Sequence, residues 1–256
     1  MLEIRNLTKI YNPGDVNELC LFEDFSLTVG TGEFVSVVGS NGSGKTSLLN
    51  LVCGSISADG GSILLDGELL GNAEHKNYKR IGRVYQNPAH GTAGELTVME
   101  NLVLAQNKNK PYGLSFGVRR SREAEYRRLL SSLGLGLEEK LHAKASSLSG
   151  GQRQALALLL CTLSDIQLLI LDEHTAALDP KSAEVVMRLT DRIVRERGIS
   201  AIMVTHNLRY AVEYGDRLLM MHKGEAVIDI SGEEKKKTTV EDLLGVFTRI
   251  SAECGN

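Results

Sequence analysis

The chain has 256 residues, of which 42% are hydrophobic and 24% are charged, so it can bury a sizeable core. Its formal net charge of −3 argues against a nucleic-acid-binding surface, which usually carries a basic excess. The sequence shows no apolar run of about 18 residues and no signal-peptide pattern, so we expect no membrane span and no secretion. Four scattered cysteines predict reduced thiols and no metal site: Cys20, Cys53, Cys161 and Cys254.

Residues 1–87 show the apolar periodicity of strands, with one helix among them. An Asp66-Gly67 pair between two short apolar runs predicts a hairpin with a type I′ turn. In chain order, the predicted strands are 2–7, 21–29, 33–38, 62–65, 68–70 and 81–85, and the helix is 46–53.

The loop between the strand 33–38 and the helix 46–53 has the spacing G-x-x-x-x-G-K-[ST] of a phosphate-binding P-loop. Glycines let backbone N–H groups approach an anion, and the helix start favours negative charge. Lys45 is expected to reach the β- and γ-phosphates, and the Thr46 hydroxyl to hold Mg²⁺. A chance glycine-rich loop is the alternative, which the strand–loop–helix context disfavours. The predicted nucleotide-binding residues here are Gly39, Ser40, Asn41, Gly42, Ser43, Gly44, Lys45, Thr46 and Ser47.

Residues 88–147 change to helical periodicity and read as a helical insertion into an α/β chain. Thr97 with Glu100 resembles a capping box. The predicted helices are 98–105 and 121–133, the latter with Tyr126, Leu129, Leu130 and Leu133 on one side. A basic cluster, Arg119, Arg120, Arg122, Arg127 and Arg128, reads as an exposed helix face, with contact to anionic lipid or a membrane subunit as the alternative.

Residues 148–256 return to alternating strands and helices, which predicts a mostly parallel, three-layer sheet core. Asp179 and Pro180 supply an N-cap and a first helical residue. Residues 232–237 are polar, and we expect a loop with solvated lysines. The predicted helices are 150–162, 180–197, 208–214 and 239–250, and the predicted strands are 167–172, 200–205, 218–222 and 226–230.

Two carboxylates follow the apolar strand 167–172, where ligands bind in α/β sheets. Asp172 is expected to support the Mg²⁺ shell, and Glu173 to act as the general base on water. An acidic strand-to-loop transition is the alternative for these residues taken alone.

The segment Ser149-Gly150-Gly151-Gln152 places a serine and two glycines at a second helix start. This predicts a second anion site with no cationic side chain in it, and an ordinary capped helix is the alternative. One chain would then have two phosphate-binding helix starts and one triphosphate to fill them.

With these motifs in order, the chain resembles an ATP-binding-cassette (ABC) transporter ATPase over essentially its whole length. The P-loop, the segment 148–152 and the strand ending at Asp172 match the Walker A, signature and Walker B motifs. The Q-loop glutamine, the D-loop aspartate, the switch histidine and the adenine-stacking aromatic are matched by Gln86, Asp179, His206 and Tyr11.

The resemblance implies a P-loop NTPase fold with an antiparallel β subdomain and a helical subdomain. The domain limits expected are 1–87 and 148–230 for the catalytic core, 88–147 for the helical subdomain and 231–256 for a tail helix. It implies that two copies dimerise head to tail, so that Ser149, Gly150 and Gly151 of one copy cover the ATP held by the other, with Asp179 acting across the interface. Gln86 would contact Mg²⁺ and water, and His206 the γ-phosphate.

The implied function is ATP hydrolysis that drives transport through separate permeases, on the cytoplasmic face of a bacterial membrane. Import of a small organic solute such as an amino acid is favoured, with an extracytoplasmic solute-binding protein as a further partner. The alternatives are a soluble ABC ATPase acting on ribosomes or DNA, and a regulatory module with little hydrolysis.

One residue departs from the family pattern. The family usually has proline after the catalytic glutamate, whereas His174 stands here. Since proline fixes φ, histidine is expected to leave this turn freer and to add a titratable group near the Mg²⁺ shell. We expect it to mark a subfamily.

Overall fold

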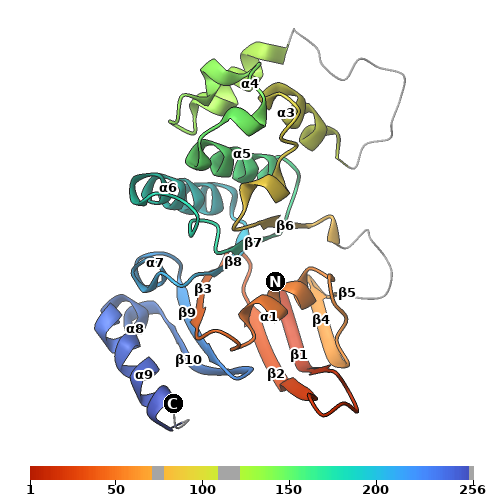
Figure 1. Ribbon diagram of the computed structural model, residues 1–256, viewed down its shortest axis with the longest axis vertical. Helices are drawn as coiled ribbons and strands as arrows, with labels where there is room; N and C mark the ends of the chain where they lie inside the picture. The colour runs from red at the N-terminus through yellow and green to blue at the C-terminus, as the bar shows by residue number, and fades with distance from the viewer. Residues whose placement is uncertain (71–77, 109–121, 254–256) are drawn as a thin grey trace. The chain divides into compact units, whose positions relative to one another are not determined.

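Two sheets organise the first of the two units into which the chain divides (Figure 1). The computed structural model describes residues 1–70, 78–108 and 122–253. Within these, the first unit comprises residues 1–81, 167–173 and 194 onward, and the second comprises 82–166 and 174–193.

An antiparallel sheet in the order β2-β1-β4-β5 is the first of these sheets. Asp66 and Gly67 link the last two strands with φ of 49° and 79°, as the type I′ prediction requires. The first strand extends beyond the predicted residue 7 because its whole length pairs with β2, with register shifts along the way. The strands are β1 (Leu2–Tyr11), β2 (Leu19–Val29), β4 (Gly60–Leu65) and β5 (Glu68–Leu70).

The second sheet contains the strands that carry the candidate site, and in this unit its order is β10-β9-β3-β8-β7. All neighbours are parallel except β10, which forms a hairpin with β9. The strands are β3 (Phe34–Gly39), β7 (Leu168–Asp172), β8 (Ser200–Val204), β9 (Arg217–His222) and β10 (Glu225–Ser231).

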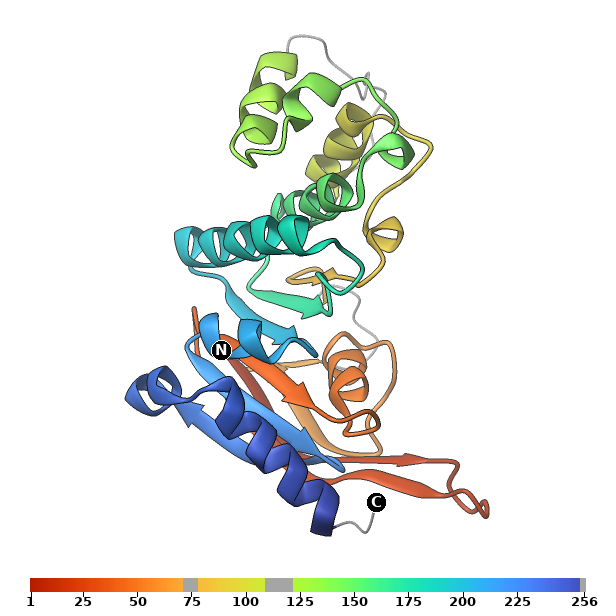
Figure 2. The ribbon, with the colours of Figure 1, turned by 60° about the vertical axis from the view of Figure 1, so that its left-hand side comes forward.

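Alternation along the central strand builds a three-layer arrangement. Val35 and Val37 face a core shared with helix α1 (Lys45–Val52) and the antiparallel sheet. Val38 faces the opposite side, in a cluster with residues of α7 (Leu208–Glu213) and α9 (Val240–Glu253). Figure 2 shows α9 running beside β10. The parallel strands β3, β7 and β8 are thus buried on both faces, as their continuous apolar runs predicted, whereas β10 is mostly exposed.

The segment 232–237 corrects a prediction, because it forms helix α8 (Gly232–Lys237) where a loop was expected. Lys235 is buried, and its ammonium donates to the carbonyl oxygens of Val212 and Tyr214 at 2.9 Å. Its apolar stem packs inside while the charged end meets the carbonyls at the end of α7. The prediction that this lysine is solvated is therefore wrong.

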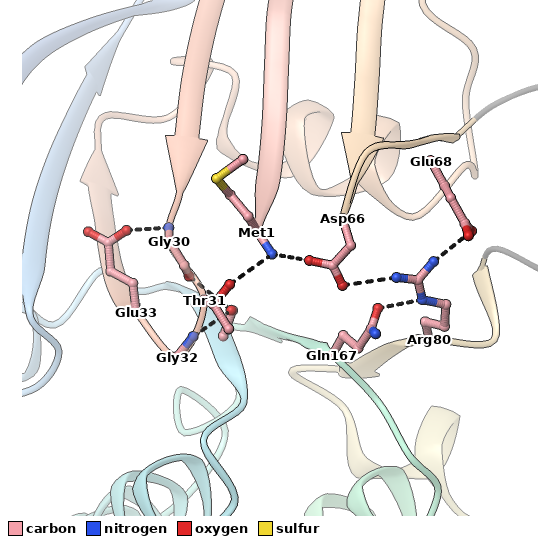
Figure 3. Close-up of polar contacts among 10 residues, drawn as sticks. Met1, Gly30, Thr31, Gly32, Glu33, Asp66, Glu68, Arg80 and Gln167 are labelled. Atoms are coloured by element: carbon pink, nitrogen blue, oxygen red, sulfur yellow. Dashed lines mark hydrogen bonds and ion pairs between the residues drawn. The ribbon is translucent and has the colours of Figure 1, made fainter.

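A polar network ties one end of the antiparallel sheet to the start of β7 (Figure 3). The Met1 amine donates to Asp66 and to the Thr31 hydroxyl. Arg80 donates to Asp66 at 2.9 Å and Glu68 at 2.7 Å, and also to Gln167, the residue before β7. The network holds the beginning of the strand whose far end carries Asp172 and Glu173.

The second unit is largely helical. Helix α3 packs against both α4 and α5. Two residues of the predicted basic cluster lie outside the described residues, Arg119 and Arg120. The same is true of Ser121, where the predicted helix 121–133 begins, and helix α4 is described from Glu123. Its elements are β6 (Ile81–Val84, which begins in the first unit), α3 (Val98–Asn107), α4 (Glu123–Ser131), α5 (Gly150–Thr162), α6 (Pro180–Arg197, to residue 193) and 3₁₀ turns at Pro88–Gly91, Leu137–Lys140 and Ala145–Ser147.

Among the described residues, no helix combines the length and apolar character needed to cross a membrane.

Candidate active site

The P-loop joins β3 to α1 and surrounds a pocket of about 320 Å³. Gly44 precedes the helix in the left-handed region, with φ of 102°. A Cβ atom on Gly44 would lie 2.9 Å from the Phe22 ring, so the close approach of this ring also requires glycine. The pocket is lined by Tyr11, Leu19, Leu21, Asn41, Gly42, Ser43, Gly44, Lys45, Thr46, Ser47, Glu173 and His206.

Lys45 is folded into its own loop. Its ammonium donates to the carbonyl oxygens of Gly39 and Ser40 at 2.8 Å and to the Ser43 hydroxyl at 3.3 Å. Burial lowers the pKa of Lys45, and the charge of Glu173 opposes that shift. The positive charge is therefore held at the bottom of the loop, beside the atoms that would bind phosphate.

Two site residues from distant parts of the sequence meet at the pocket. Glu173 directly follows β7, and its Oε1 lies 2.7 Å from Nε2 of His206, which follows β8. These strands are parallel neighbours, so their carboxyl ends meet at one edge of the sheet. Asp172, the last residue of β7, pairs with Val204 at the same edge.

Glu173 has an unusual backbone for a non-glycine residue, with φ of 47°. Its N–H donates to the carbonyl oxygen of Val204 at 3.0 Å. This bond helps to hold Glu173 in the left-handed conformation.

Tyr11, at the end of β1, also lines the pocket. Its hydroxyl lies 3.1 Å from Oγ of Ser47 in α1, and the Lys9 ammonium lies 5.5 Å from its ring centroid. Leu19 and Leu21 of β2 add apolar lining that sequence analysis missed. No motif marks them, since only strand pairing brings them opposite the P-loop.

A turn far along the chain supports the P-loop. The Gly224 N–H, between β9 and β10, donates to the carbonyl oxygen of Ser43 at 3.0 Å. A Cβ atom on Gly224 would lie 1.6 Å from the Leu21 carbonyl oxygen, so only glycine fits. Sequence analysis predicted the strands 218–222 and 226–230 on either side of this glycine and missed its contact with the P-loop.

The remaining predicted site residues belong to the second unit. Ser149 caps α5 as predicted, because its hydroxyl accepts from the Gln152 N–H and the Gln152 side chain accepts from the Ser149 N–H. Gly150 and Gly151 open this helix. Lys140 donates to Oε1 of Gln152 at 3.0 Å, so a cation lies at this helix start although none is in the motif.

Gln86 and Asp179 lie in loops of this unit. Gln86 is exposed, and the carbonyl oxygen of the preceding Tyr85 accepts from buried Gln154 of α5 at 3.0 Å. Asp179 caps α6, since its carboxylate accepts from the Ser182 N–H at 3.0 Å.

The sequence suggested that histidine at 174 leaves the turn after Glu173 freer. Instead, His174 is 1% exposed and its ring contacts the Thr190 hydroxyl, so this turn is restrained. Burial lowers its pKa to about 4, and the ring is therefore neutral at neutral pH.

Comparison with known proteins agrees with this geometry. Residues 22–176 match the family described as ABC transporter. The chain is 47% identical over 251 residues to the tyrosine transport ATP-binding protein of Clostridioides difficile (strain R20291), covering 96% of this chain and 98% of that protein. It is 37% identical to the phosphonates import ATP-binding protein PhnC 1 of Rhodopseudomonas palustris (strain HaA2), covering 96% of this chain and 92% of that protein.

A solved structure gives the same result. The chain matches a dimeric ATP-binding cassette in a post-hydrolysis state, bound to ADP and Pi, with a TM-score of 0.75 and 28% identity. The match covers 90% of this chain and 98% of that one. With the family match and the P-loop pocket together, we conclude that the chain belongs to the ABC transporter family, as an ATP-binding subunit that hydrolyses ATP.

Proposed function

We propose that this subunit drives a bacterial importer of a small organic solute, with an amino acid as the favoured class. The observation that carries the proposal is the pocket in which the P-loop, Glu173 and His206 meet. The solute class is supported by the names of the relatives, of which the tyrosine transport protein shares 47% identity.

Each pocket residue has a role in the proposed reaction. The Lys45 ammonium neutralises charge on the β- and γ-phosphates, and Tyr11 stacks on adenine. Glu173 accepts a proton from the attacking water, and His206 contacts the γ-phosphate. In the structure these last two side chains bind each other, so ATP binding has to separate or reorient them.

The site also fits Mg²⁺, which takes oxygen ligands from one or two side chains and from the phosphates. The Thr46 side chain is exposed at the start of α1, and Asp172 ends a strand at the same edge of the sheet as Glu173 and His206. Thr46 and Asp172 would hold the ion, with Gln86 as a further oxygen donor. The ion would neutralise phosphate charge during hydrolysis.

A second copy of this chain completes the site in our proposal. Its Ser149, Gly150, Gly151 and Gln152 cover the triphosphate, and its Asp179 acts across the interface. The helical segment 88–147 is the docking surface for membrane permeases, beside a catalytic core of 1–87 and 148–230 and a tail of 231–256. A solute-binding protein outside the membrane delivers the solute. The ATP-binding subunit lies on the cytoplasmic face of the membrane in this proposal.

Glu173→Gln tests the assignment of the base. We expect phosphate release to fall at least about 100-fold, because a general base contributes that much or more. ATP-dependent dimers should persist, since the substitution removes a charge that ATP binding does not need. Phosphate release and light scattering with ATP measure the two properties. Glu196→Gln, on an exposed residue of α6, is the matched control. Unchanged phosphate release in Glu173→Gln would reject the base.

Copurification with a polytopic permease tests the transport role. A subunit that associates with ribosomes or DNA and with no permease would contradict it.

A further inference from the structure

The residue after the proposed base is a buried histidine with one well-defined partner. Nε2 of His174 lies 3.1 Å from Oγ1 of Thr190, one of the fully buried residues of α6. The Thr190 hydroxyl in turn donates to the carbonyl oxygen of Val186 at 2.8 Å. All three residues belong to the second unit, so the contact is internal to it.

The direction of this hydrogen bond follows from counting protons. A threonine hydroxyl has one proton, and here it is given to Val186, so its oxygen can only accept from the imidazole. The Nε2 atom of His174 must therefore carry the proton of this bond. His174 is therefore a donor that fixes its ring, and the backbone behind it, to α6.

The residue before His174 has a backbone conformation that a proline at position 174 would disfavour. A residue that precedes proline is pushed toward extended conformations, because the proline ring clashes with it. Glu173 instead has φ of 47°, and its N–H is bound to Val204. A non-glycine residue stays in this region only when its surroundings hold it there. The Val204 bond holds one side of Glu173, and the His174–Thr190 bond holds the other.

We propose that His174 is a positioning residue for Glu173, and that its hydrogen bond to Thr190 restrains the backbone directly after Glu173. The proposal depends on the proposed function, in which Glu173 is the base. The bond acts on the reaction only through the backbone of residues 173–174, since His174 itself is buried and does not line the pocket.

Thr190→Val is the primary test. Valine keeps the shape of threonine and removes the oxygen that accepts from His174. We expect kcat to fall about two- to tenfold, the range that corresponds to losing one hydrogen bond. The KM for ATP and the binding of a fluorescent ATP analogue should stay within about twofold, because the P-loop is untouched. Thr190→Ser keeps the hydroxyl and should retain the kcat of the natural chain.

A double-mutant cycle separates positioning from stability. His174→Leu removes the donor and keeps an apolar side chain of similar size. In that background Thr190→Val should lower kcat no further, although it still removes the bond to Val186 and lowers the melting temperature. Assays well below the lowest melting temperature keep all variants folded.

Two results would overturn the inference: equal kcat for Thr190→Val and Thr190→Ser, or an equal loss of kcat from Thr190→Val in both backgrounds. Glu173→Gln keeps this failure distinct from failure of the proposed function. If that variant loses turnover while Thr190→Val does not, only the role of His174 is rejected.

Discussion

The loops that begin helices α1 and α5 both contain glycines, but they treat the first N–H groups of the helix in different ways. Before α1, Gly44 is in the left-handed region and, as a glycine, has no side chain that could cap the helix. Before α5, Ser149 has an extended backbone and forms a complete capping box with Gln152. The first helix start leaves N–H groups for an anion, whereas the second already satisfies one of its own.

The two helix starts also differ in where their lysine side chains come from and what these contact. Lys45 is part of the P-loop and is buried against its carbonyl oxygens. Lys140 reaches α5 from another segment and donates to the side chain of Gln152 at 3.0 Å. We infer that the P-loop binds phosphate by itself, and that the Ser149 loop contributes only after a nucleotide is in place. The following predictions test this difference.

Lys45→Ala should have the largest effect. It removes the cation on which charge neutralisation depends, and we expect phosphate release to fall at least about 100-fold, with weaker ATP binding. Phosphate release and binding of a fluorescent ATP analogue measure this. Lys140→Ala is the matched control, and equal losses in both variants would erase the distinction between the two sites.

Gly224→Ala should destabilise the P-loop from outside. The added methyl would collide with the Leu21 carbonyl oxygen, and alanine is strained at φ of 82°. We expect a loss of about 2–4 kcal/mol in the free energy of unfolding, measured by urea titration. Gly67→Ala is the control, because it has φ of 79° and open space around it. Similar losses in both would show that strain alone, without the contact, sets the cost.

Ser149→Ala should separate the two helix starts by function. Loss of the cap costs about 1 kcal/mol of stability. ATP binding to a single copy should stay the same, while phosphate release falls, since the second copy can no longer complete the site. A nucleotide-binding assay at low protein concentration and a turnover assay at high concentration measure these effects. Weaker ATP binding at low concentration would contradict the inference.

Thr97→Ala gives the smallest expected effect and calibrates the previous one. Thr97 and Glu100 form a capping box at α3 with the same geometry as that of α5. We expect a loss of about 1 kcal/mol in the free energy of unfolding and unchanged phosphate release per folded molecule. A fall in phosphate release as large as that of Ser149→Ala would mean that the loss of a helix cap, and not the loss of a ligand contact, explains the effect of both substitutions.

Sequence analysis predicted most of the fold because its signals are local. The capped helices 150–162 and 180–197 have the predicted limits, since Ser149 and Asp179 supply side-chain caps at their starts. The parallel strands were found as apolar runs buried on both faces. Tyr11, Lys45, Glu173 and His206 were named from motifs, and the structure brings them to one pocket.

Three features were out of reach because they depend on residues far apart in the chain. Lys235 is buried by carbonyl oxygens more than 20 positions away. Gly224 supports the P-loop from a late hairpin, and His174 binds Thr190 of the next helix. The residue types alone indicate a solvated side chain for Lys235, an ordinary turn at Gly224 and a less restrained turn at His174.

The sequence by itself determined the kind of chemistry, because a P-loop and its partner motifs are short patterns whose meaning comes from backbone geometry and side-chain type. Tertiary structure decided which polar groups are buried and what satisfies them, including the bond after Glu173. The physical reason is that a buried polar group needs a partner in space, and the partner can come from any part of the chain.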